Sequence, residues 1–133
     1  MTSELRVDNL KGSTTGGSIN VLGEGTSATT NMQQGLCKAW VHVHDNASID
    51  DSFNISAIED TGTGNIKTTY TNNMANDDYA GSGLARLNSG GGDAFMRFSS
   101  SIITSQTIYI CANESGTDID GETQTMLTHG DLA

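Results

Sequence analysis

The chain of 133 residues contains no proline, only two cysteines, and few aromatic side chains (5%). Without proline, its turns must be built by glycine and asparagine, which tolerate positive φ angles. Cys37 and Cys111 are too few for the disulfide framework of a small secreted domain, and their spacing is not that of a metal site. An unpaired cysteine behaves as a small hydrophobe. We therefore expect two buried free thiols.

Basic residues are also scarce, with 6 against 16 acidic residues and a formal charge of −10. An acidic surface repels phosphate, which argues against binding to nucleic acid or to anionic lipid. No apolar run has the length of a membrane span, and residues 1–6 show neither the basic region nor the apolar core of a signal peptide. We expect a soluble protein that is made in a cytoplasm and not inserted into a membrane.

Large apolar side chains are few as well: Leu, Ile, Val and Phe total 25 of 133 residues, which is in the range of disordered chains. The charged fraction is only 17%, however, and the apolar residues alternate regularly, which favours a folded chain. A thin core in each subunit would be completed by its neighbours. We therefore expect a homo-oligomer, most simply a homotrimer.

The clearest pattern lies between Cys37 and His44, where apolar and polar residues alternate. One face would carry Cys37, Ala39, Val41 and Val43, and the other Lys38, Trp40, His42 and His44. Period two over eight residues is typical of a half-buried strand. A second strand-like run, residues 53–58, leads into a Gly/Thr cluster at 60–64, which we expect to form a turn.

Further strand-like runs follow at short intervals, separated by segments rich in Asn, Ser and Gly. They are residues 66–70, 78–87, 94–99, 102–112 and 123–128. No window has helical periodicity with caps. The sequence predicts an all-β fold, a small antiparallel β-sandwich or jelly-roll-like domain over residues 35–133. Within it, residues 102–103 and 108–110 are the best candidates for a strand buried on both faces.

Residues 1–34 differ from the remainder of the chain. Two short apolar pieces, residues 5–7 and 19–22, are embedded in Gly, Ser, Thr and Asn. Alone, such a segment cannot offset its loss of conformational entropy. It is either a disordered lead or an extended arm that pairs with other chains. We prefer the arm, crossing to another subunit.

His42 and His44 are candidate metal ligands. They lie two residues apart on one face of a strand, and three such pairs around a threefold axis would offer six nitrogen ligands to a transition metal. The alternative is that both simply continue the polar face of the strand. No other cofactor is indicated.

Other chemistry finds little support. Acidic residues cluster near positions 45–51, 77–78 and 118–122, but both possible EF-hand registers fail, so we interpret them as solvated turn carboxylates. No nucleophile elbow or nucleotide-binding fingerprint is present, and we expect no enzymatic activity. Tyr70, Tyr79 and Tyr109 could stack on sugars, although core packing is expected for at least two of them.

Several segments resemble, in order, a module of bacteriophage tail-fibre and related virion proteins, common in marine phages. The module typically reads QGLAKAWVNFNG, then DSFNVSSITDNGTGDYTV, then AMANANYA. The matching segments here are residues 33–41, 51–64 and 74–80, with residues 4–10 resembling what precedes the module. This chain departs from the pattern at His42-Val43-His44, where the module has Asn-Phe-Asn, and at Cys37, where it has Ala.

The resemblance implies a virion structural protein, and trimeric phage fibre tips are known to bind metal through a His-x-His motif. Residues 1–34 would attach to capsid or tail proteins, and residues 35–133 would form a head that adheres to a glycan or protein of the host surface. A capsid decoration, cement or head-fibre protein that stabilises the particle is the alternative. Under both alternatives the resemblance implies that the protein is located in the virion.

Overall fold

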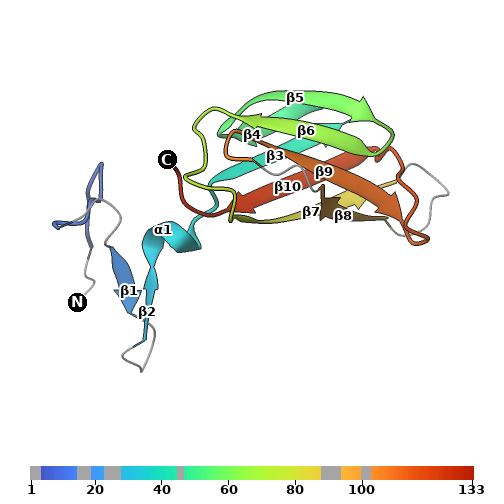
Figure 1. The fold of residues 1–133 in the computed structure, drawn as a ribbon. Helices are drawn as coiled ribbons and strands as arrows, with labels where there is room; N and C mark the ends of the chain where they lie inside the picture. The colour runs from blue at the N-terminus through green and yellow to red at the C-terminus, as the bar shows by residue number, and fades with distance from the viewer. Residues whose placement is uncertain (1–3, 15–18, 23–27, 45–46, 88–93, 100–102) are drawn as a thin grey trace. The chain divides into compact units, whose positions relative to one another are not determined.

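The computed structural model describes residues 4–14, 19–22, 28–44, 47–87, 94–99 and 103–133. The chain divides into two compact units, Met1–Leu36 and Cys37–Ala133, each of which is described by itself (Figure 1).

The first unit contains a β-hairpin and one helical turn. Strand β1 (Asn20–Leu22) pairs antiparallel with β2 (Thr29–Asn31), and α1 (Met32–Gly35) follows. The Asn31 side chain accepts a hydrogen bond from the Gln33 N–H at 2.9 Å, as an N-terminal cap does. None of the residues of this unit whose burial is described is buried. The sequence did not predict the hairpin.

The second unit is a sandwich of two four-stranded antiparallel sheets, which confirms the predicted all-β fold (Figure 1). One sheet has the order β4-β3-β10-β7 and the other β5-β6-β9-β8. The strands are β3 (Ala39–His44), β4 (Ser48–Phe53), β5 (Ile55–Gly62), β6 (Asn65–Tyr70), β7 (Ala80–Arg86), β8 (Ala94–Phe98), β9 (Gln106–Asn113) and β10 (Thr123–His129).

The first and last strands of the sandwich, β3 and β10, pair at the centre of one sheet, with Val41 opposite Met126. Strands β6 and β9 pair at the centre of the other, with Ile66 opposite Tyr109. These four strands supply the core, in which Val41, Val43, Ile66, Tyr109 and Met126 pack together. The edge strands are therefore β4 and β7 of one sheet and β5 and β8 of the other.

The alternation predicted for residues 37–44 is confirmed along β3, where Ala39, Val41 and Val43 are each 1% exposed. The prediction is wrong at its start. Lys38, placed on the polar face, is buried, and Cys37, expected to be buried, is half-buried. The Cys37 thiol donates to the Ala39 carbonyl at 3.1 Å, so it lies against the strand end and not in the core. Cys111 is the fully buried free thiol.

The strand predicted at residues 53–58 is confirmed over residues 55–58, which lie in β5, but Asn54 separates them from Phe53 at the end of β4. Asn54 has a φ of 58° and lies where the chain passes from β4 to β5, from one sheet to the other. Its side-chain N–H donates to the carbonyls of Lys38 and Asn72, each at 3.0 Å, and its side-chain oxygen accepts the Asn72 N–H at 2.7 Å. Asparagine tolerates this conformation because its short polar side chain can bond locally.

The prediction that residues 102–103 and 108–110 form a strand buried on both faces is wrong. Ile103 is 47% exposed and lies outside β9, while residue 102 falls outside the described residues. In β9, Tyr109 is buried, whereas Ile108 and Ile110 are half-buried on the opposite face. No helix within the described ranges is long and apolar enough to cross a membrane.

Candidate functional site

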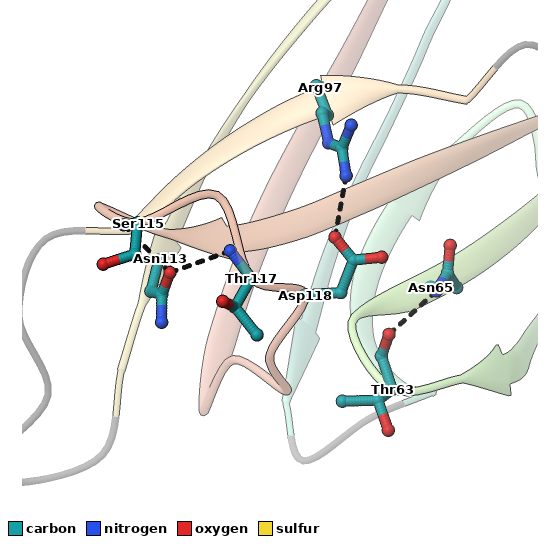
Figure 2. Close-up of polar contacts among 7 residues, drawn as sticks. All are labelled: Thr63, Asn65, Arg97, Asn113, Ser115, Thr117 and Asp118. Atoms are coloured by element: carbon teal, nitrogen blue, oxygen red, sulfur yellow. Dashed lines mark hydrogen bonds and ion pairs between the residues drawn. The ribbon is translucent and has the colours of Figure 1, made fainter.

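One end of the sandwich carries a loop surface formed by the β5–β6 turn, the β9–β10 loop and Arg97 of β8. Figure 2 shows its polar residues. They are Thr63, Asn65, Arg97, Asn113, Ser115, Thr117 and Asp118.

Asn113 organises the β9–β10 loop. Its side-chain oxygen accepts hydrogen bonds from the backbone N–H groups of Ser115 at 3.0 Å and Thr117 at 2.9 Å (Figure 2). The backbone N–H of Asn113 donates to the Thr117 carbonyl at 2.9 Å, and the Gly116 N–H donates to the Asn113 carbonyl at 2.9 Å. Gly116 supplies the positive φ, 78°, that this tight turn requires. The loop tip is thus fixed by hydrogen bonds within five residues.

Two further contacts tie this loop to the sheet. The Arg97 guanidinium on β8 donates to the Asp118 carboxylate at 2.8 Å (Figure 2). The Gly64 N–H, in the β5–β6 turn, donates to the Asp120 carboxylate at 2.6 Å. These bonds link three segments far apart in sequence, and they give both carboxylates a partner. The acidic residues at 118 and 120 are therefore structural anchors, not merely solvated turn carboxylates.

The groups left facing solvent on the loop surface are small and polar. Residues 114–117, Glu-Ser-Gly-Thr, are exposed, and so is Thr63 of the neighbouring turn. The backbone of residues 115–117 is already fixed by Asn113, so their hydroxyl groups are presented without a further cost of ordering the loop backbone. Such an arrangement suits a ligand recognised by hydrogen bonds, for example a polyhydroxylated one.

His42 and His44 lie on the outer face of the sheet β4-β3-β10-β7. His42 Nδ1 is 3.7 Å from the Asp50 carboxylate, and the His42 side chain is 43% exposed. Near His44, Glu122 bonds Arg86 at 2.7 Å, and this bond lowers the pKa of the Glu122 carboxyl. The described part of one chain contains no group of three or more metal-binding side chains. Metal binding by His42 and His44 at a threefold axis stays a prediction.

The three tyrosines form a buried polar cluster with Thr68, Thr107 and Thr128. All six are at most 7% exposed, so none of the tyrosines can stack on a sugar at the surface. Core packing, expected for at least two of them, holds for all three.

Hydroxyl groups bridge the two sheets within this cluster. The Tyr109 hydroxyl bonds Thr128 at 2.7 Å, and the Tyr70 hydroxyl bonds Thr107 at 2.8 Å and Thr128 at 3.2 Å. The Tyr79 hydroxyl bonds Thr107 and donates to the Ile103 carbonyl at 3.0 Å. Burial raises the pKa of Tyr79 and Tyr109 above the usual range of a phenol.

Sequence reasoning missed most of the loop surface. It expected turn-rich segments between the strand-like runs, and Asn113 followed by Glu-Ser-Gly-Thr is a recognisable Asx-turn pattern. It could not pair Arg97 with Asp118, which lie 21 residues apart and meet only through the packing of β8 on β9. Comparison of the chain with protein-family models, with curated proteins and with solved structures found no match.

Proposed function

We propose that this chain is a structural protein of a bacteriophage particle, whose β-sandwich adheres to the host surface through the loop surface. Residues 1–34 attach it to the particle. The observation that carries the adhesive role is the pre-ordered β9–β10 loop, which exposes Ser115 and Thr117 while Asn113 fixes their backbone. Weak hydrogen-bonding sites of this kind gain avidity when several copies are held together.

The resemblance to the virion module supports this proposal because the residues that carry it have structural roles here. Asn54 forms the corner between the sheets, Gly64 the β5–β6 turn, and Met74 and Tyr79 are buried. These four residues of the matching segments thus belong to the framework of the sandwich. The β9–β10 loop lies outside the matching segments, so its side chains are the ones that would set this chain's own specificity.

The exposed apolar residues of the first unit support the attachment role. Val21, Leu22 and Leu36 are 50%, 64% and 55% exposed. A two-stranded hairpin is marginally stable alone, and contact with another protein would bury these side chains. Capsid or tail proteins are the partners that we propose for this segment.

Labelling of particles with an antibody against the purified protein, followed by imaging, tests the location. Signal at tail tips or fibres agrees with adhesion. Signal spread over the capsid favours the decoration role instead, and absence of signal from the particles contradicts both.

Adhesion is tested with the purified full chain as a competitor of particle adsorption to host cells. The double variant Ser115→Ala/Thr117→Ala removes two exposed hydroxyls but keeps the backbone N–H groups that bond Asn113. We expect competition to fall by at least about tenfold, because each lost hydrogen bond costs about 1 kcal/mol. The matched control, Thr71→Ala/Thr104→Ala, removes two hydroxyls at the other end of the sandwich and should compete like the wild type. Equal competition by both variants contradicts the assignment to this loop.

A further inference from the structure

The edge strands β4, β5 and β7 of the sandwich differ in how they are protected from pairing. Strand β4 carries Asp50 and Asp51 beside a register shift, and β5 carries Glu59 and Asp60 between two such irregularities. Charges and bulges of this kind discourage the addition of another strand. Strand β7 pairs with β10 in unbroken register over seven residues, and its only charge is Arg86 at the end. No described residue pairs with its other side.

A small cavity of about 80 Å³ lies where β8 packs against β7, beside this edge. Gly81 and Gly83 of β7 form one wall, and Met96 and Phe98 of β8 form another. The two glycines leave room for these large side chains, since a Cβ on Gly81 would lie 1.7 Å from the Phe98 ring. A strand added to β7 would point every second side chain inward, in line with Gly81 and Gly83 and toward this cavity.

The first unit contains a segment with the complementary features. Residues 4–10, Glu-Leu-Arg-Val-Asp-Asn-Leu, alternate between polar and apolar side chains over their first five positions. Leu5 and Val7 are 76% and 55% exposed, and none of the seven residues is buried. This pattern is typical of a half-buried strand, yet residues 4–10 do not lie in a strand.

We propose that β7 is a strand acceptor, and that residues 4–10 of a second copy of this chain are the strand that it accepts. The pairing would satisfy the free backbone groups of β7, and a branched aliphatic side chain, Leu5 or Val7, would enter the cavity. A cavity of about 150 Å³ holds benzene, so one of about 80 Å³ suits such a side chain.

Length and charge agree with this assignment. The donated segment and β7 both span seven residues. Glu4, Arg6 and Asp8 nearly cancel one another in charge, so the segment can approach a chain with a net charge of −10. The proposal explains why an exposed apolar segment and an open edge occur in the same chain, and it does not depend on the adhesive role.

Sedimentation equilibrium of the full chain tests the proposal. The wild type should associate. Leu5→Ser/Val7→Ser should weaken association at least about tenfold, because the aliphatic side chain that enters the cavity is lost. The control Glu4→Ser/Arg6→Ser changes the opposite face of the segment without changing net charge, and should associate like the wild type. A monomeric wild type, or undiminished association of the Leu5/Val7 variant, overturns the proposal.

Disulfide trapping identifies the contact directly and does not require the serine variants to fold. One population carries Arg6→Cys and a differently tagged one carries Ser82→Cys. Mixing under mild oxidation should give a cross-linked heterodimer of the two tags. Ser48→Cys, on edge strand β4, replaces Ser82→Cys in the control and should cross-link at least about tenfold less. Equal cross-linking to both edges contradicts the choice of β7.

Discussion

Val21 in the first unit and Val41 in the sandwich both lie in short strands, yet Val21 is 50% exposed and Val41 is 1% exposed. The difference lies in what faces each strand. Strand β1 pairs only with β2, whereas β3 lies between two strands and under a second sheet. A strand of this composition gains stability from a second layer and not from its own sequence, because burial of apolar surface is the main favourable term.

Glycine substitutions give the largest expected contrast between the two units. Gly64 has a φ of 72°, and a Cβ there would lie 2.5 Å from the Cys111 carbonyl oxygen. Gly64→Ala should therefore lower the free energy of unfolding by at least about 3 kcal/mol, from the left-handed conformation together with the clash against backbone. Urea unfolding followed by circular dichroism measures the change.

Two matched glycines separate the causes. Gly116 has a φ of 78°, but a Cβ added there would meet open space. Gly116→Ala should therefore lower the free energy of unfolding by only about 1–2 kcal/mol. Gly35 of the first unit has no positive φ and no neighbour closer than 4.0 Å, and Gly35→Ala should leave unfolding of the sandwich unchanged. A Gly64→Ala cost no larger than that of Gly116→Ala would show that the close approach to Cys111 does not matter.

The fold class could be predicted because alternation is a local signal. Val41 and Val43 alternate with His42 and His44, and this pattern places β3 without knowledge of its partners. Strand β4, Ser-Ile-Asp-Asp-Ser-Phe, could not be found in this way, because as an edge strand it is mostly exposed and polar. Its existence depends on pairing with β3.

The candidate site was less predictable because its contacts are tertiary. A turn near Asn113 follows from local chemistry, but its attachment by Asp118 to Arg97 depends on how the strands pack. The burial of Lys38 and of all three tyrosines likewise has no local signal. Tyrosine and threonine are accepted on either face of a strand. Which of their hydroxyls become buried therefore depends on the facing sheet.

Substitutions in the buried tyrosine cluster should have an effect of intermediate size on the free energy of unfolding. Tyr109→Phe removes the 2.7 Å bond to Thr128 and should cost about 1–2 kcal/mol. Thr128→Val should cost more, because it deprives both Tyr109 and Tyr70 of a partner. If the hydroxyls act as one network, the double variant should cost less than the sum of the two single variants. Exact additivity would contradict a coupled network.

The same cluster predicts a loss of stability at alkaline pH. The folded-state pKa of Tyr109 and Tyr79 is raised by burial, whereas the unfolded chain ionises near pH 10. A raised pKa leaves stability intact below pH 10 and reduces it as the pH increases above that value, because only the unfolded state then releases protons. Unfolding followed between pH 8 and 11 should show this decrease, and a smaller decrease in Tyr109→Phe.

The smallest effect is expected from removing residues 1–34. No residue of the first unit whose burial is described is buried, so at high dilution the truncated and intact chains should unfold within about 0.5 kcal/mol of each other. At higher concentration the two should separate. The melting temperature of the intact chain should increase with concentration because association stabilises the folded state, while that of the truncated chain should stay constant. A difference that persists at high dilution would mean that the first unit stabilises its own sandwich, and the contrast between Val21 and Val41 would then no longer mark two independent units.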